Sequence, residues 1–176
     1  MRGRARRRRL CDGQADGGVA WRVAGDRRRR IHGRHEGADQ GNAAMTNRLQ
    51  PVRDFAATAP LAAWLGFSAS GEDEIVFRLT FNEAHIGNPA IRALHGGVIA
   101  AFLELAMQAD LAARTGGKVV AASVSIDYLS SSRPEDMTAR VRLLREGRRL
   151  AFMEAEGRQA DDTRLVAVAR ACFTLG

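Results

Sequence analysis

The stretch from Val98 to Met107 constrains the fold more than any other part of the chain. Nine of its ten residues are Val, Ile, Ala, Phe, Leu or Met, and the tenth is Glu104. A surface helix carries its apolar residues as a stripe, whereas a helix that is apolar nearly all round is covered on most sides. We therefore expect a buried helix that starts at the His95 turn, runs to about Thr115 and stops at the glycine pair that follows.

Glu104 is the polar exception inside this helix. Burying an unpaired carboxylate costs several kcal/mol or makes it take up a proton. One interpretation is that Glu104 lies at the helix edge and reaches water or an Arg. A functional interpretation comes from His95-Gly96-Gly97 at the helix start, because paired glycines let another molecule approach free N–H groups at the positive end of the helix dipole. Such donors, followed by a carboxylate, can polarise and attack a carbonyl.

The formal net charge of +7 is confined to the first 44 residues, which hold twelve Arg against five Asp and Glu. Residues 45–176 hold fifteen basic and fifteen acidic residues. Residues 1–44 are rich in Gly and Arg without an apolar period, so we expect a disordered tail before a folded domain over residues 45–176. Three accounts of the tail stay open: an arm for RNA or another anionic surface, a transit peptide, and an upstream extension that is translated from a misplaced start codon and ends just before Met45. A transit peptide would be rich in Ser and poor in acids.

The remaining composition indicates a protein without cofactors. Cys11 and Cys172 form no disulfide framework or metal-binding pattern, and the four histidines add no ligand spacing. We therefore expect a cytoplasmic chain that needs no metal or other cofactor. No uninterrupted apolar run of about 18 residues is present, so no membrane span is expected.

The rest of the folded region alternates in ways that predict strands. Residues 51–67 predict one or two short helices around Pro60, residues 75–81 a half-buried strand, and residues 82–94 a loop. Four strands follow the long helix without another helix, with turns at Gly147-Arg148 and Asp161-Asp162. This order predicts an α+β domain in which a curved, mostly antiparallel sheet wraps one central helix. The first of the four strands is expected to line one face with Val120, Ala122, Val124, Ile126 and Tyr128.

A combined motif points to a family. Asn-Pro, a short gap, Leu-His-Gly-Gly-Val-Ile-Ala, a carboxylate nine residues after the His, and a later Ser-Ile-Asp-Tyr-Leu strand together resemble the hotdog-fold acyl-coenzyme A thioesterases of the phenylacetic-acid-degradation (PaaI-like) type. The resemblance covers about residues 60–175. It implies a hotdog fold and hydrolysis of an acyl-coenzyme A thioester.

The resemblance also implies roles for single residues. Glu104 matches the family's nucleophile or general base, and Gly96 matches the glycine whose N–H binds the thioester oxygen. Gln108, one turn after Glu104, matches a polar residue that assists the carboxylate. Asn88 is the nearest match to a loop amide that orders water or the carbonyl, although it lies one residue further from the His than is usual. His95 is expected to cap the helix or orient the Gly96 peptide.

Substrate binding and assembly are implied in the same way. Gly97 permits close packing at the helix start, and coenzyme A phosphates usually meet basic and hydroxyl residues after the helix. The residues available for that contact are Ser131, Ser132, Arg133 and Arg148. The family's sites form between two subunits, which implies a homodimer, often paired into a homotetramer.

Two rival functions stay open. A hotdog hydroxyacyl-thioester dehydratase would pair a loop His with a helix Glu, and His85 with Glu104 would supply them, although their spacing is longer than in that family and the dehydratase motif lacks the His-Gly-Gly turn. The other rival is a module that binds an acyl thioester without turnover, or an RNA-associated protein built on the basic tail. Nucleic acid is not expected as a partner, because the tail has only Trp21 as an aromatic residue.

Overall fold

The computed structural model describes residues 38–71 and 74–176, with side chains from Arg48 onward. The predictions for residues 1–37 of the tail lie outside this range. Three helices, one short 3-10 turn and eight strands make up the described chain. In order they are α1 (Ala38–Thr58), α2 (Pro60–Trp64), β1 (Phe67–Ser70), β2 (Val76–Leu79), the 3-10 turn Glu83–His85, β3 (Ile86–Asn88), β4 (Ala93–Leu94), α3 (Gly96–Thr115), β5 (Val119–Tyr128), β6 (Met137–Glu146), β7 (Leu150–Gln159) and β8 (Arg164–Leu175).

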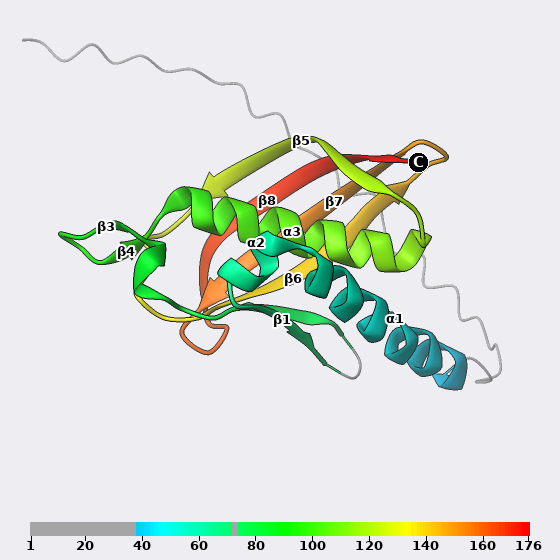
Figure 1. Cartoon of the computed structure of the whole chain (residues 1–176), viewed down its shortest axis with the longest axis horizontal. Helices are drawn as coiled ribbons and strands as arrows, with labels where there is room; N and C mark the ends of the chain where they lie inside the picture. The colour runs from blue at the N-terminus through cyan, green and yellow to red at the C-terminus, as the bar shows by residue number, and fades with distance from the viewer. Residues whose placement is uncertain (1–37, 72–73) are drawn as a thin grey trace, which may run out of the picture. The chain divides into compact units, whose positions relative to one another are not determined.

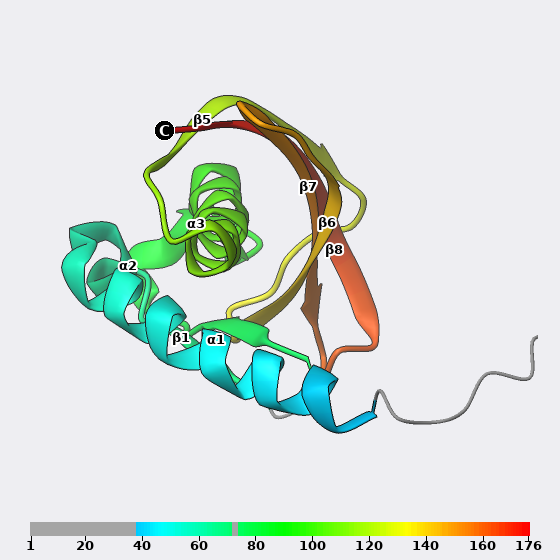
Figure 2. The ribbon, with the colours of Figure 1, turned by 90° about the vertical axis from the view of Figure 1, so that its right-hand side faces the viewer.

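One curved sheet wraps α3. Six strands lie in the order β1-β2-β6-β7-β8-β5, and every neighbouring pair is antiparallel. Figure 2 looks along α3 and shows the sheet curving around it, while α1 and α2 lie on the side that the sheet leaves open. The prediction of an α+β hotdog domain is confirmed. The short β3-β4 hairpin forms a separate two-stranded sheet beside the start of α3 (Figure 1).

Small residues on the concave face of the sheet let α3 lie close to it. Phe102, Leu103 and Met107 of α3 are fully buried against this face. Half of the buried residues of β6, β7 and β8 are alanines, which leave room for those large side chains. Among the described helices, α3 is long and apolar enough to cross a membrane, a property that buried core helices share. The alanines of the concave face are Ala139, Ala151, Ala155, Ala167, Ala169 and Ala171.

A β-bulge changes which side of β5 faces the core. The register with β8 shifts between Ala121 and Ser123. Val119 is buried and Ala121 packs against the core before the bulge, whereas Val124 and Ile126 do so after it. The predicted face is therefore correct from Val124 onward and wrong at the start of the strand, because the extra residue of a bulge reverses the alternation.

Other boundaries also differ from the sequence prediction. α1 begins at Ala38 and runs through Pro51, so the helix crosses the predicted domain boundary at Met45. The edge strand β1 was not predicted, and the predicted loop over residues 82–94 contains the β3-β4 hairpin. The strand expected over residues 75–81 is confirmed but shorter, with Phe77 and Leu79 fully buried.

A buried ion pair fastens α1 to α3. The carboxylate of Asp110 is only 2% exposed, and it accepts hydrogen bonds from Arg48 of α1 at 3.1 Å and from Arg114 at 2.5 Å. Removing one partner of a buried ion pair leaves an unpaired buried charge, which lowers the free energy of unfolding. We therefore expect this pair to stabilise the fold rather than to take part in a reaction. Asp110 is thus the fully buried acid of α3, the role that the sequence pattern suggested for Glu104.

Replacing Asp110 with Asn should destabilise the domain. The amide keeps the shape of the carboxylate but loses both charge-assisted bonds, and Arg48 and Arg114 can recover some hydration because they are 19% and 30% exposed. We expect a loss of about 1–3 kcal/mol, measured by urea denaturation. Asp54→Asn on exposed α1 surface is the matched control and should change the unfolding free energy by less than about 0.5 kcal/mol. Equal effects of the two substitutions would contradict this role of Asp110.

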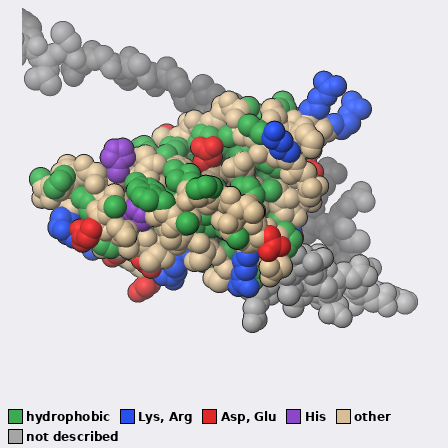
Figure 3. Space-filling view, in the orientation of Figure 1, with side chains coloured by type: hydrophobic (Ala, Val, Ile, Leu, Met, Phe, Trp, Pro, Cys, Tyr) green, Lys and Arg blue, Asp and Glu red, His purple; other side chains and the backbone are tan. Residues whose placement is uncertain are grey.

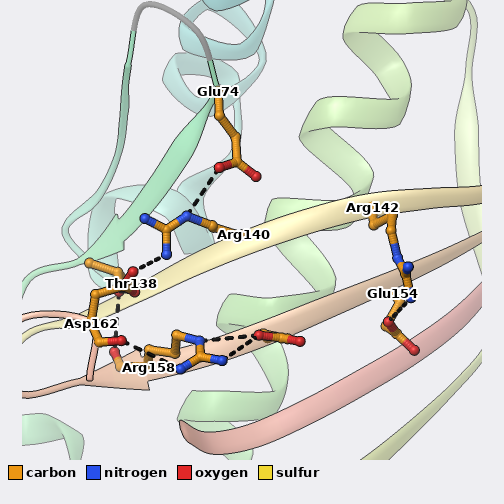
Figure 4. Close-up of polar contacts among 8 residues, drawn as sticks. Glu74, Thr138, Arg140, Arg142, Glu154, Arg158 and Asp162 are labelled. Atoms are coloured by element: carbon orange, nitrogen blue, oxygen red, sulfur yellow. Dashed lines mark hydrogen bonds and ion pairs between the residues drawn. The ribbon is translucent and has the colours of Figure 1, made fainter. Parts of the chain in front are cut away.

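The convex face of the sheet carries paired charges (Figure 4). Asp162 accepts hydrogen bonds from Arg140 and from Thr138, the latter at 3.0 Å, and Arg140 also binds Glu74 at 3.2 Å. Burial alone would raise the pKa of Asp162, but the bonds from Arg140 and Thr138 outweigh it and hold the pKa below its usual range. On the same face, Glu154 of β7 lies between Arg170 and Arg142, and hydrogen bonds from these two arginines lower its pKa.

These lowered pKa values predict acid sensitivity. Each carboxylate adds stability above its unfolded pKa of about 4, and this stability is lost as the pH falls through the lower folded pKa. The urea midpoint should therefore stay level from about pH 7 to 5 and drop below about pH 4. In Glu154→Gln the midpoint should be lower at neutral pH and should fall less steeply in acid. The same acid slope in wild type and variant would rule out the contribution of Glu154.

Candidate active site

The start of α3 is capped by the side chain of His95. The ring nitrogen Nδ1 accepts a hydrogen bond from Gly97 N–H at 2.9 Å, and the backbone at His95 is extended, as is usual for an N-cap. Because Nδ1 accepts, the proton of the neutral ring lies on Nε2. His95 as a whole is exposed. The structure therefore gives His95 the capping role.

Three glycines make this turn possible. A Cβ on Gly87 of β3 would lie 2.5 Å from His95 Cα, and a Cβ on Gly97 would lie 3.0 Å from His95 Nδ1. A Cβ on Gly96 would lie 3.2 Å from the hydroxyl oxygen of Tyr128. The His-Gly-Gly sequence thus follows from close packing around the helix start, with His95 on one side and Tyr128 on the other.

Gly96 offers the one uncommitted N–H of this turn among the described residues. Gly97 N–H is bound to the His95 ring, and the N–H groups of Val98 and Ile99 donate to the His95 carbonyl at 2.9 and 3.2 Å. Gly96 N–H has no hydrogen-bond partner in the part of the chain that the structure describes. A free donor at the positive end of a helix is suited to bind a carbonyl oxygen as it becomes negative.

Tyr128 holds the next peptide group in place. Its hydroxyl donates to the Gly96 carbonyl at 2.8 Å, while Gly97 N–H of the same peptide group donates to His95. The peptide between Gly96 and Gly97 is therefore bound on both sides, and such linked hydrogen bonds strengthen one another. This arrangement fixes the orientation of the Gly96 backbone before any ligand arrives.

An open hollow of about 480 Å³ adjoins Gly96. Its lining includes Leu94, Ile99, Tyr128, Leu129 and the serines that follow β5. The predicted substrate-binding residues Ser131 and Ser132 therefore do lie beside Gly96. Ser132 is buried and its hydroxyl contacts the Leu94 carbonyl at 3.4 Å, whereas Ser131 is exposed.

The loop that carries these serines is held by Gln159 and Arg164. Gln159 is 2% exposed; it accepts from Arg133 N–H at 2.9 Å and donates to the carbonyls of Arg133 and Glu135 at 3.0 and 2.9 Å. Arg164 donates to the Ser131 carbonyl at 2.8 Å. The side chain of Arg133 is exposed, so the structure brings its backbone, and not its charge, into this arrangement.

Glu104 lies on the half-buried face of α3. It forms no hydrogen bond or ion pair within the described residues, and Gln108 lies on the same face by the i, i+4 spacing. The Gln108 amide donates to the Val119 carbonyl at 2.8 Å, at the start of β5. The face that carries Glu104 therefore turns toward β5, the open edge of the sheet. Gln108 binds this strand and not the Glu104 carboxylate.

Two other predicted residues are engaged elsewhere. Asn88 is exposed at the end of β3, and its side chain accepts from Ala90 N–H at 3.1 Å, which stabilises the hairpin turn. His85 is 1% exposed; its Nδ1 accepts from Asn82 N–H at 3.2 Å, and its Nε2 lies 3.1 Å from the Trp64 carbonyl. Both ring nitrogens of His85 are thus occupied by backbone, which leaves the dehydratase alternative without its base.

Arg148 lies in the β6-β7 turn, away from Gly96. The backbone register places Leu150 opposite Thr174 and Thr174 opposite Val120, so this turn is at the Val119 end of β5. Gly96 is at the other end, beside Tyr128. Apart from Asn88 in the β3-β4 hairpin, the predicted site residues therefore fall into three groups within one chain: the Gly96 hollow, the Glu104 face of α3, and the β6-β7 turn.

Sequence reasoning missed Tyr128 and Gln159 as site residues. Tyr128 was read as one residue of an alternating strand, although its position in the Ser-Ile-Asp-Tyr-Leu motif was a usable signal. Gln159 gave none, because the backbone groups of the serine loop that it binds lie 24 to 26 residues away, and its other partner is the Arg164 side chain.

Comparison with known proteins identifies the family of this arrangement. Residues 92–166 match the family model described as the thioesterase superfamily, a range that contains the His-Gly-Gly turn, α3 and three of the long strands. A search of curated proteins found no match.

Solved structures of similar proteins agree with this family match. A Bordetella protein from the thioesterase superfamily is 30% identical, with a TM-score of 0.69, over 73% of this chain and 98% of that protein. The PaaI protein from the phenylacetic acid degradation operon of E. coli shares the fold at 19% identity, with a TM-score of 0.66 over 74% of this chain and 94% of that one. A phenylacetic acid degradation-related protein of Ralstonia eutropha does so at 24% identity, with a TM-score of 0.60 over 69% and 96% of the two chains. The wrapped helix, its glycine turn and these matches together place the chain in the thioesterase superfamily, whose common reaction is thioester hydrolysis.

Proposed function

We propose that this protein hydrolyses acyl-coenzyme A thioesters at a site formed by two copies of the chain. The observation that carries the proposal is the free N–H of Gly96, next to a peptide group that His95 and Tyr128 hold in place, at a residue that lines a hollow of about 480 Å³. Such a donor binds the thioester oxygen more tightly as the carbonyl becomes tetrahedral, and this difference lowers the barrier.

Glu104 supplies the second half of the reaction. As a general base it takes a proton from water while the water oxygen attacks the thioester carbon. As a nucleophile it forms a mixed anhydride that water then hydrolyses. In both routes the oxygen of the tetrahedral intermediate is bound by Gly96 N–H, the carbon–sulfur bond breaks, and coenzyme A leaves as the thiolate. Both routes require the same position of the carboxylate.

The distance along α3 favours a partner's Glu104 over the chain's own. Glu104 follows Gly96 by two turns, which is about 12 Å along the helix axis at about 1.5 Å per residue, whereas reacting atoms must come within about 3.5 Å. β5 offers the surface for a second copy, since it is a ten-residue strand at the edge of the sheet. Antiparallel pairing of two such strands would satisfy their free backbone groups and give a two-fold symmetric homodimer. Gln108 lies on the same face of α3 as Glu104 and donates a hydrogen bond to β5. Glu104 therefore lies on the side of α3 that faces this edge.

Binding without turnover is the remaining alternative. It is favoured by Gln108, because its amide is bound to Val119 and does not assist Glu104 within one chain. The comparison of Glu104 with its amide variant separates the two functions, since mere binding requires no base.

Replacing Glu104 with Gln should lower kcat for acyl-coenzyme A hydrolysis by about a hundredfold or more, because the amide cannot take a proton or form an anhydride. Thiol release from a panel of acyl-coenzyme A substrates measures the effect. Glu83→Gln, an exposed acid in the turn before β3, is the control and should retain the wild-type rate. Equal rates for wild type and Glu104→Gln would end the proposal of hydrolysis by this residue.

Mixing two inactive variants tests whether the site is divided between chains. Gly96→Pro removes the N–H donor at the first helical position, and the extended backbone of His95 suits a following Pro. Because its Cβ would lie 3.2 Å from the Tyr128 hydroxyl, the melting temperature of the variant is measured to verify that it folds. In a mixed dimer with Glu104→Gln, one site carries both substitutions and the other carries none. Subunit exchange at equal amounts should therefore restore about a quarter of the wild-type activity. No recovery in verified mixed dimers would place both residues of a site in one chain.

Replacing Tyr128 with Phe should lower kcat by about 3-fold to 10-fold, the equivalent of one hydrogen bond of about 0.5–1.5 kcal/mol. The ring remains beside Gly96, so KM and the melting temperature should change little while the Gly96 backbone loses its restraint. Steady-state kinetics and thermal unfolding of the same samples measure both quantities. A parallel fall of melting temperature and activity would indicate a role in folding alone.

A further inference from the structure

The β6-β7 turn bears a second hollow, which the reaction at Gly96 does not use. It has a volume of about 750 Å³ and is lined by three arginines and two large apolar residues, Leu150 and Phe152. Both apolar side chains are exposed, at 42% and 41%. In Figure 3 Lys and Arg side chains gather at this end of the molecule, near the C-terminus. The arginines of the hollow are Arg145, Arg148 and Arg149.

These arginines differ from most others in the described chain. Nine arginines form ion pairs with acidic side chains, among them Arg140, Arg142 and Arg170 on the convex face of the same sheet. Arg145, Arg148 and Arg149 are exposed, and within the described residues none of the three forms an ion pair. Three guanidinium groups without an ion pair in the described chain therefore line one hollow, although Glu146 lies in the same turn.

This combination fits a phosphorylated nucleotide. Guanidinium groups bind phosphate oxygens through paired hydrogen bonds and lose less hydration than lysine would. An exposed aromatic ring such as Phe152 offers a face on which a base can stack. A simple inorganic anion would use the charge but not the exposed apolar surface.

Within one chain this hollow is too far from the Gly96 hollow to share a substrate. The two lie at opposite ends of β5, which spans about 30 Å at roughly 3.3 Å per residue. The hollow is also displaced sideways by two strands, β8 and β7, or about 10 Å. A two-fold axis through paired β5 strands reverses one strand relative to the other. It therefore brings the partner's β6-β7 turn to the end at which Gly96 and Tyr128 lie.

We propose that the arginines of the β6-β7 turn of one subunit bind the phosphorylated nucleotide of a coenzyme A thioester whose acyl carbon lies at Gly96 of the other subunit. This inference rests on the proposed thioesterase function and names the part of the substrate that the turn recognises. It also divides the residues expected to meet coenzyme A. Ser131 and Ser132 lie beside the reacting end of the substrate, whereas Arg148 lies with Arg145 and Arg149 at its nucleotide end.

The test compares substrates that differ only at the nucleotide. Steady-state kinetics are measured with one acyl group carried by coenzyme A, by dephospho-coenzyme A and by pantetheine. In Arg145→Ala/Arg148→Ala the KM for acyl-coenzyme A should rise about tenfold or more, while kcat stays within about twofold and the KM for acyl-pantetheine is unchanged. Higher ionic strength should raise the wild-type KM for acyl-coenzyme A more than that of the variant. Arg53→Ala, an exposed arginine of α1, is the control and should match wild type.

Two outcomes would overturn the inference: an unchanged KM for acyl-coenzyme A, or an equal rise for acyl-pantetheine, which would place the effect at the thioester end. Calorimetric titration with free coenzyme A and with pantetheine gives a readout that needs no turnover. Weaker binding of coenzyme A alone by the double variant would support the nucleotide site even if no acyl-coenzyme A were hydrolysed. Active wild type with unaltered binding by the variant would leave the thioesterase proposal standing and reject the nucleotide site.

Discussion

The position of every site residue depends on how α3 is buried in the concave sheet. Phe102 and Leu103 fill space that the alanines of β6, β7 and β8 leave open, so the helix has one well-packed position. That position runs α3 alongside β5 and sets its first turn beside Tyr128. It also leaves one face of the helix half-buried toward the open strand. Core packing therefore determines where the site residues lie.

The first turn of α3 is rigid because its polar groups are already satisfied in pairs. His95 takes Gly97 N–H, and Tyr128 binds the carbonyl of the same peptide group, while Gly96 N–H remains without a partner in the described chain. A donor that is fixed before substrate binds costs little to reorganise during the reaction. A Cβ on Gly87 would clash with the His95 backbone, and one on Gly96 or Gly97 would lie 3.2 or 3.0 Å from a side-chain atom, so close packing favours glycine at all three positions.

The sequence predicted what is encoded locally. The length and burial of α3, the facing of Phe77 and Leu79, and the glycine stop after Thr115 all follow from periodicity and end signals within a few residues. Features that depend on distant partners were not predictable. Asp110 binds Arg48 from a position 62 residues away, and the bulge in β5 exists only in the pairing with β8. Most residues of the candidate site were predicted from the sequence, but their separation into three regions of the chain was not.

The proposed two-fold symmetry would account for three features that are incomplete in a single chain. β5 has an open edge, Glu104 lies about two turns from the Gly96 donor that it would serve, and the cationic β6-β7 turn lies at the far end of the sheet from the hollow. Antiparallel pairing of two β5 strands would satisfy the edge, place each Glu104 face against the other chain, and carry each turn to the other's Gly96 end. Because a single two-fold axis would complete all three features, they jointly support the proposed site shared by two subunits.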